Sequence, residues 1–109
     1  ARIGALLDVE APTAIFAANN QLAEHAWHVL RRRGLRLPHD MSLVGFDDIS
    51  WLEMVSPAIT TVAQPTVEMG RRAARLLLRR IERPGSERVT EVLQPWLMPR
   101  PSSGPPAAS

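Results

Sequence analysis

The spacing of apolar and polar residues along the chain predicts an alternation of strands and helices. Residues 13–18 and 42–46 are short, mostly apolar runs with the length of strands that are buried on both faces. Between them, residues 21–33 place apolar side chains on one helical face and charged side chains on the other. Because a strand, a helix and a strand follow one another within about 30 residues, they form a βαβ unit with parallel strands and a right-handed crossover.

Further elements are expected on both sides of this unit. Residues 1–8 form the last turns of a helix, 49–55 form a short helix, and 60–64 are extended. The clearest helical periodicity runs over residues 66–83, which follow a proline and carry an apolar stripe opposite a row of arginines. Residues 87–93 alternate in polarity and predict a strand near an edge. The predicted fold class is therefore α/β, with a parallel sheet and flanking helices.

The length and the two ends of the sequence bear on domain organisation. A chain of 109 residues holds one domain or part of one. It begins with alanine inside a predicted helix, so we interpret it as a fragment. Residues 101–109 contain only proline, serine, glycine and alanine, which predicts a disordered tail.

Composition excludes several classes of protein. The chain has no cysteine, which rules out disulfide frameworks, thiolate metal sites and thiol nucleophiles. All thirteen basic residues are arginine, yet the net charge is only +2, which indicates no nucleic-acid-binding surface. No apolar segment approaches the roughly 18 residues that a membrane span needs. We therefore expect a soluble, cytoplasmic protein without a membrane partner.

Polar side chains follow the strands of the predicted sheet, where open parallel sheets bind ligands. Asn19 follows the first strand, Asp47 follows the second, and Gln64 ends the third extended segment. Two amides and a carboxylate suit a polyhydroxyl or heterocyclic ligand. The alternatives are a helix cap for Asn19 and a turn-stabilising role for Asp47. Trp51, just past Asp47, either stacks on an apolar face of the ligand or packs in the core.

Catalysis and metal binding are not indicated by these residues. Asp47 and Asp48 are adjacent, so on an extended chain their side chains point in opposite directions, and no nucleophile accompanies them. His25 and His28 share a helical face but lack a third ligand at suitable spacing. We therefore predict no catalytic residue, no metal and no cofactor.

Four segments together carry a resemblance to a known family. They are Pro12-Thr-Ala-Ile-Phe-Ala-Ala-Asn-Asn20, Arg33-Gly-Leu-Arg-Leu-Pro-His-Asp-Met-Ser-Leu-Val-Gly-Phe-Asp-Asp48, Pro57-Ala-Ile-Thr-Thr-Val-Ala-Gln-Pro65 and Met69-Gly-Arg-Arg-Ala-Ala74. In this order and spacing the chain resembles the C-terminal part of lactose-repressor-type (LacI/GalR) transcriptional regulators. The similarity extends from about residue 12 to residue 100.

The resemblance implies a periplasmic-binding-protein-like sensor of two α/β subdomains with a small, sugar-like effector in the cleft. Residues 1–100 would be the C-terminal part of this effector-binding domain, and the helix at 66–83 would pack on a missing N-terminal subdomain. The implied ligand contacts are Asn19, Asp47 and Gln64. Such regulators bind operator DNA as dimers through a helix-turn-helix outside this chain, and effector binding tunes that affinity.

The sequence departs from the family pattern at one position. Asn20 stands where the family commonly has aspartate, which removes a charge near the cleft.

Two other functions remain open. The first is the solute-binding component of a sugar ABC transporter, which shares the fold and the strand-end aspartate. The run from Leu35 to Asp48 favours the regulator. An enzyme that uses Asp47 is a third possibility.

The helix predicted at residues 66–83 raises the question of what covers it. Its arginines are interrupted by Glu68 and Glu82, which can pair with them, so we interpret that side as a solvated face. The opposite stripe is apolar and contains Val67, Ala74, Leu77 and Ile81. Without the N-terminal subdomain this stripe lacks a partner, which predicts self-association into a dimer.

Overall fold

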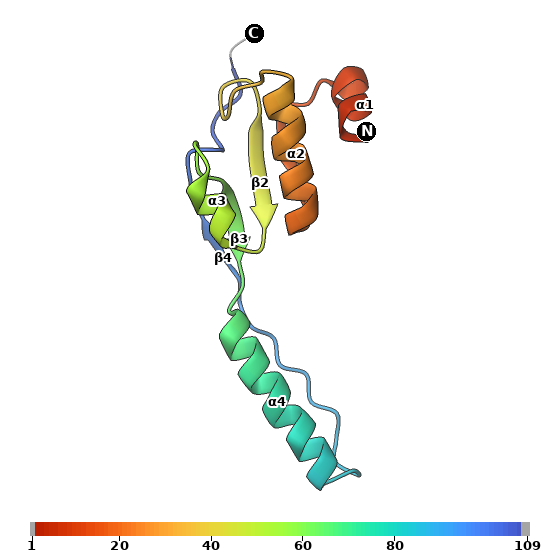
Figure 1. The fold of residues 1–109 in the computed structure, drawn as a ribbon. Coiled ribbons are helices and arrows are strands. Elements are labelled where there is room, and N and C mark those ends of the chain that lie inside the picture. Colours follow the sequence, from red (N-terminus) through yellow and green to blue (C-terminus); the bar gives the residue numbers. More distant parts are fainter. Residues whose placement is uncertain (1, 108–109) are drawn as a thin grey trace. The chain divides into compact units, whose positions relative to one another are not determined.

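The computed structural model describes residues 2–107; Ala1 and the last two residues of the predicted tail, 108 and 109, lie outside the described part (Figure 1). The chain divides into two compact units. The first unit contains the residues up to Ala63 and those from Trp96 onward, and the second contains residues 64–95. Each unit is described by itself.

A four-stranded sheet organises the first unit. Its strands are β1 (Ala14–Phe16), β2 (Ser42–Phe46), β3 (Thr60–Ala63) and β4 (Trp96–Met98), which lie side by side in that order. The pairs β1–β2 and β2–β3 are parallel, and β4 adds antiparallel to β3. The predicted α/β class with a mainly parallel sheet is confirmed.

Three helices accompany this sheet, in agreement with the sequence pattern. They are α1 (Arg2–Glu10), α2 (Asn20–Arg32) and α3 (Ser50–Met54). The apolar face of α2 packs on β2, which connects to it through the predicted βαβ crossover. The buried core consists of Ala26, Leu30, Met41, Leu43, Leu52 and Ile59. This core holds β2, and with it the loop that follows the strand, in a fixed position.

The turn that leads into β2 is held by a carboxylate. Asp40 Oδ2 accepts from the backbone N–H of Arg36 at 2.7 Å and from its Nε at 3.2 Å, and Oδ1 lies 3.1 Å from His39 Nδ1. The backbone hydrogen bond, then the contacts with His39 and the Arg36 side chain, hold the pKa of Asp40 well below its usual range. The ionised form of Asp40 therefore stabilises the folded state.

We expect Asp40→Asn to make stability less dependent on pH. A carboxyl whose pKa is lower in the folded than in the unfolded protein contributes stability above its unfolded pKa, about 3.9, and loses it as the pH falls. The difference in unfolding free energy between wild type and variant should therefore shrink as the pH is lowered from about 6 toward 2. Urea denaturation at several pH values measures this difference. A difference that is constant over this range would contradict the assignment.

The C-terminal residues differ from the sequence-based expectation. Ser102 is fully buried: its Oγ accepts from Thr60 N at 2.8 Å and donates to Leu43 O at 2.5 Å. Its backbone N–H donates to Ala58 O and its carbonyl accepts from Leu43 N, both at 3.0 Å. The prediction of disorder is wrong for this part of the segment 101–109. The reason is that buried backbone groups at the start of β2 and β3 need partners, and the C-terminal segment supplies them.

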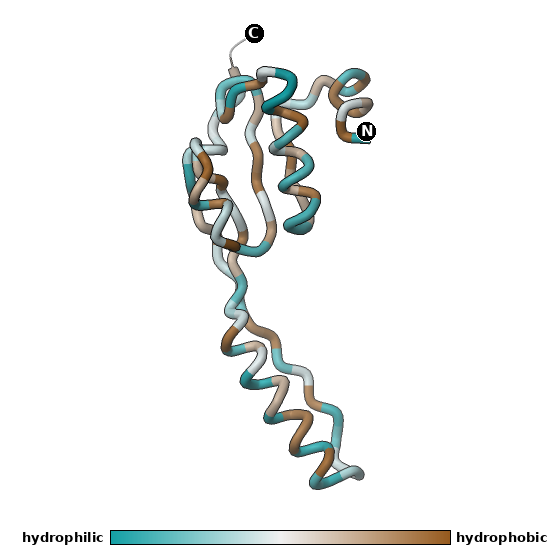
Figure 2. Tube along the Cα trace, viewed as in Figure 1, coloured by the Kyte–Doolittle hydropathy of each residue, from teal (hydrophilic) through white to brown (hydrophobic). Residues whose placement is uncertain are grey.

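The second unit contains one helix and an extended return segment. Helix α4 (Thr66–Glu82) matches the predicted helix, but none of its residues is buried. Its apolar residues recur along the tube in Figure 2. The strand predicted at residues 87–93 is wrong: these residues are irregular, and the strand that pairs with β3 is β4 instead. A β-compatible pattern forms a strand only when a pairing partner is present.

Candidate ligand-binding site

Asn19 and Asp47 lie at the same edge of the sheet. In the parallel register Phe16 is level with Val44, and each site residue follows three positions later. The N–H of Ala17 continues this ladder by donating to Val44 O at 2.8 Å. The two polar residues therefore leave neighbouring parallel strands at their carboxyl ends, which is the placement predicted from the sequence.

Asn19 is held in place by the helix that follows it. Its backbone is extended (φ −155°, ψ 172°), and its side-chain Oδ1 accepts from the N–H of Leu22 at 2.9 Å. This contact is the N-cap predicted as the alternative role. The cap uses the amide oxygen and orients the side chain, while the amide nitrogen is the group with donors for a ligand. The capping role and the ligand-contacting role are therefore compatible.

Asp47 has a backbone conformation that is uncommon for a residue with a side chain. Its φ is +75°, in the left-handed region that aspartate tolerates better than most residues. Its N–H donates to Val62 O at 2.9 Å, and its carbonyl accepts from the hydroxyl of Thr61 at 3.1 Å. Thr61 is fully buried. Strand β3 thus holds the loop through both backbone groups of Asp47, which keeps this residue in the left-handed conformation.

Asp48 has a structural role. Its carboxylate accepts two hydrogen bonds from Arg100, from Nη1 to Oδ1 at 2.8 Å and from Nη2 to Oδ2 at 3.0 Å. Nη1 also donates to Ile59 O at 3.0 Å. The hydrogen bonds to Asp48 raise the pKa of the Arg100 guanidinium. The two adjacent aspartates therefore divide their roles: Asp48 ties the loop to the C-terminal segment, and Asp47 is the one at the strand end.

Asn20 adds an acceptor to this region that sequence reasoning did not assign. It opens α2 directly after Asn19, and its Oδ1 is buried without a hydrogen-bond partner among the described residues. A buried amide oxygen without a partner is unfavourable unless water or a ligand donates to it. Its neighbour Asn19 was found through its position at the strand end, a signal that applies equally to Asn20.

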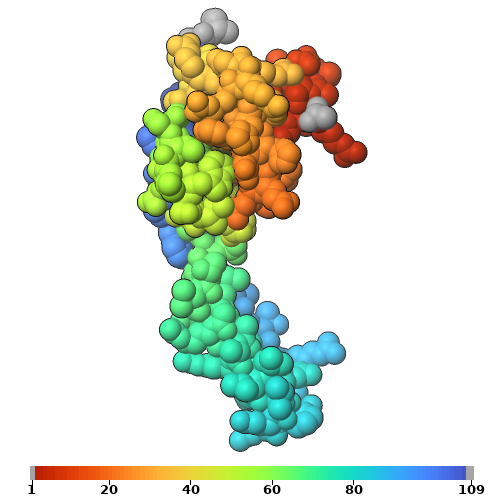
Figure 3. All heavy atoms as spheres, in the orientation of Figure 1, coloured from red at the N-terminus to blue at the C-terminus, as the bar shows by residue number. Residues whose placement is uncertain are grey.

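Trp51 is placed by its contact with another aromatic residue. It lies on α3, and its ring meets Trp27 of α2 edge to face, with centroids 6.2 Å apart. The two helices adjoin on the face shown in Figure 3, where α2 is orange and α3 yellow-green. Trp27 lies eight residues beyond Asn19, about 12 Å along the helix axis. The structure therefore brings Trp51 to the core-packing position, and not to Asn19.

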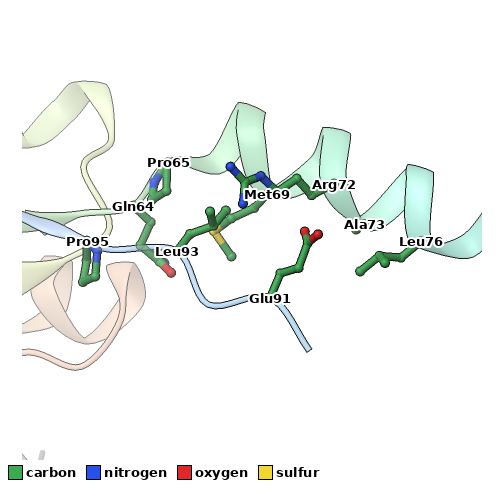
Figure 4. A pocket seen from close by; sticks show the side chains of 9 residues that line it. All are labelled: Gln64, Pro65, Met69, Arg72, Ala73, Leu76, Glu91, Leu93 and Pro95. Carbon is green, nitrogen blue, oxygen red and sulfur yellow. The ribbon is translucent and has the colours of Figure 1, made fainter. Parts of the chain in front are cut away.

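Gln64 is the first residue of the second unit and lines a pocket there (Figure 4). The pocket, with a volume of about 320 Å³, lies between α4 and the return segment. It is lined by Gln64, Pro65, Met69, Arg72, Ala73, Leu76, Glu91, Leu93 and Pro95. Its walls are mainly apolar, with the charged groups of Arg72 and Glu91 on opposite sides. Gln64, Arg72 and Glu91 supply its polar side chains.

The described residues also bear on metal binding and on membrane insertion. No group of three or more histidine, aspartate or glutamate side chains between residues 2 and 107 is arranged to hold a metal ion. Within the same part of the chain, no helix has both the length and the apolar character needed to cross a membrane.

Comparison with known proteins identifies the family. The model of the periplasmic binding protein-like domain matches residues 1–103. The chain belongs to this family. Among characterised relatives, it is 45% identical over 104 residues to the HTH-type transcriptional regulator DegA of Bacillus subtilis, which covers 94% of this chain and 30% of DegA. The resemblance to lactose-repressor-type regulators is thus confirmed.

Solved structures agree with this assignment to the periplasmic binding protein-like family. A LacI family transcriptional regulator from Enterococcus faecium with bound ribose is 38% identical with a TM-score of 0.84, over 95% of this chain and 39% of that one. The complex of the transcriptional regulator CelR with cellobiose is 43% identical with a TM-score of 0.83, over 90% and 30%. The chain therefore spans about a third of the length of the proteins that it matches.

Proposed function

We propose that this chain is the ligand-sensing part of a transcriptional regulator and contributes to the binding of a sugar or a similar small polar effector. The observation that carries the proposal is the position of Asn19 and Asp47 at the same sheet edge, with Asp47 fixed in a left-handed conformation. A carboxylate accepts hydrogen bonds from two hydroxyls, and an amide nitrogen donates to a third. The bound ribose and cellobiose of the related regulators support a carbohydrate effector.

The four predicted contacts differ in their support. Asn19 and Asp47 are the proposed ligand contacts, since both follow strands that end at the same sheet edge. Gln64 is proposed as a further contact on the basis of the family resemblance and its position directly after β3. The contact of Trp51 with Trp27 favours a packing role for that side chain. We propose that the site binds an effector and catalyses no reaction. The protein would then be a sensor that needs no cofactor, and not an enzyme.

The mechanism that we infer is a population shift. In a two-subdomain sensor, an effector that prefers one closure of the cleft biases the whole protein toward it by its difference in affinity. Residues 1–100 would form the C-terminal part of the sensor, and α4 would pack on an N-terminal subdomain outside this chain. A cytoplasmic homodimer would then contact operator DNA through a helix-turn-helix, also outside this chain. The related regulators support this proposal over the solute-binding component of a transporter.

Asp47→Asn tests the proposed site in the full-length protein that carries this chain. Asparagine tolerates the left-handed conformation and keeps the shape of the side chain, so the variant should fold normally. Loss of charge-assisted hydrogen bonds to the effector should weaken binding by about 10- to 100-fold. Isothermal titration with a panel of monosaccharides and disaccharides, beginning with ribose and cellobiose, identifies the effector and measures this change.

A matched control is Asp8→Asn, which also removes one negative charge from the first unit. Asp8 pairs with Arg33 at 2.7 Å between α1 and the end of α2, away from the sheet edge, so effector affinity should not change. Equal affinity of wild type and Asp47→Asn would remove Asp47 from the site. A panel without any binding sugar would contradict a carbohydrate effector.

A further inference from the structure

Thr61 carries a hydroxyl group at a position in the core where a hydrocarbon side chain would fit. The residue lies in β3 and is fully buried. Valine is also β-branched, has nearly the same shape and is equally suited to a strand, so packing alone does not require the hydroxyl. Burial of a hydroxyl costs free energy unless it forms a hydrogen bond. The contact that this hydroxyl makes is therefore the property that distinguishes threonine from valine here.

The hydroxyl of Thr61 donates to the carbonyl of Asp47 at 3.1 Å. Asp47 is the residue with a φ of +75°, a conformation that a residue with a side chain keeps only where its surroundings hold it. The N–H of Asp47 is held as well, by the carbonyl of Val62 at 2.9 Å. The two contacts differ in kind, because only the one from Thr61 comes from a side chain. It can therefore be removed by substitution without altering the backbone groups of β3.

The hydroxyl of Thr61 lies in a confined space beneath α2. Gly45 of β2 is the register partner of Thr61, and a methyl group built on Gly45 would lie 3.7 Å from both Thr61 Oγ1 and Ala23 Cβ. Ala23 is fully buried in α2, and its N–H donates to the carbonyl of Asn19 at 3.0 Å. The space thus lies between the elements that carry the two proposed ligand contacts. In Thr61→Val a methyl group would fill the position of the hydroxyl, and water could not enter to replace the lost donor.

We propose that Thr61 is a positioning residue for effector binding: its hydroxyl holds the backbone of Asp47, so that the carboxylate is presented to the effector in one fixed direction. The inference rests on the proposed function, because it assigns a role at the same site. A contact that is ordered before binding costs less to form than one that must be ordered by the ligand. Thr61 touches no effector itself and acts only through Asp47.

Thr61→Val in the full-length protein tests this role, with Thr60→Val as the matched control. Loss of the hydrogen bond to Asp47 should weaken the binding of ribose or cellobiose by about three- to tenfold. Thr60 is also buried in β3, but its hydroxyl contacts the carbonyl of Arg100 and the hydroxyl of Ser103. Thr60→Val should therefore lower stability and leave affinity unchanged. Isothermal titration separates these effects, because unfolded protein lowers the stoichiometry whereas a misplaced carboxylate raises the dissociation constant.

Thr61→Ser provides the rescue. Serine keeps the hydroxyl and loses the methyl group, so this variant should be less stable than the wild type and yet bind the sugar with nearly the wild-type affinity. An affinity of Thr61→Val equal to that of the wild type would overturn the proposal. So would an equal loss of affinity in Thr60→Val or in Thr61→Ser, because the effect would then not depend on the hydroxyl.

Hydrogen exchange without any sugar gives a readout that does not depend on the proposed function. In Thr61→Val the N–H of Asp47, bonded to Val62 O, should exchange about three- to tenfold faster than in the wild type. The N–H of Ala17, bonded to Val44 O, is the control on the neighbouring strand and should keep its rate. Unchanged exchange at Asp47 would overturn the proposal. If neither sugar binds the wild type, the proposed carbohydrate effector fails, while this measurement still decides whether Thr61 holds Asp47.

Discussion

Replacing Arg100 with alanine is expected to lower the unfolding free energy of the first unit by about 3 to 5 kcal/mol. The side chain of Arg100 is only 9% exposed, and that of Asp48 is 26% exposed. Removing the arginine would leave this carboxylate and the carbonyl of Ile59 without the donors at 2.8–3.0 Å that they now have. The cost arises from the shielded groups that remain, and not from the favourable energy of the pair itself.

Urea denaturation followed by circular dichroism measures this effect. Arg100→Lys should restore only part of the stability, because an ammonium group cannot donate both hydrogen bonds of the planar guanidinium. Arg71→Ala is the control, since it removes an exposed pair with Glu68 and should change stability by less than about 1 kcal/mol. If Arg100→Ala behaved like Arg71→Ala, the Asp48–Arg100 contact would not stabilise the fold.

Ser102→Ala is expected to have the second-largest effect, a loss of about 1 to 3 kcal/mol of unfolding free energy, because backbone groups would be left without a partner. Two such groups depend on the hydroxyl: the N–H of Thr60 and the carbonyl of Leu43, at 2.8 Å and 2.5 Å. Both lie where β3 and β2 begin, and Ser102 is fully buried, so water has no access to replace the bonds.

Ser103→Ala is the natural comparison for this variant. Ser103 is next in sequence, and its hydroxyl lies 2.7 Å from Thr60 Oγ1, but the residue is only partly buried. Water can substitute for part of what is lost there, so the decrease in unfolding free energy should be below that of Ser102→Ala. A larger effect at Ser103 would mean that the C-terminal segment is held by a different contact from the one described.

The elements that local patterns specify were predicted correctly. The pattern of apolar residues predicts both the buried face of α2 and the strand β2. The reason is that burial of one helical face, or of a whole strand, determines which residues are apolar. The proline before α4 and the apolar stripe along it predicted the helix at residues 66–83, and the structure ends it one residue earlier, at Glu82. The positions of Asn19 and Asp47 at one sheet edge followed from the parallel order of the strands. These features depend on the sequence close to each residue.

What the sequence could not provide are contacts between distant residues. The pair of Asp48 and Arg100 spans 52 positions, and no local pattern distinguishes Arg100 from the other arginines. The C-terminal serines belong to a composition typical of disorder, and only the unpaired backbone at the starts of β2 and β3 explains why Ser102 is fixed. The strand prediction for residues 87–93 was wrong for a related reason. Their alternating polarity is compatible with a strand, but no strand in the described part of the chain pairs with them.

The antiparallel pairing of β3 with β4 has a consequence for engineering. Ala63 is directly opposite Trp96, so the chain leaves the sheet and returns to it at neighbouring backbone positions, about 5 Å apart. Residues 64–95 are therefore an insertion between the two strands of a β-hairpin. A two-residue Asn-Gly turn could bridge the same gap and reduce the protein to its sheet and three short helices. Such a minimal module would show whether the first unit folds, with Asn19 and Asp47 at its sheet edge, in the absence of residues 64–95.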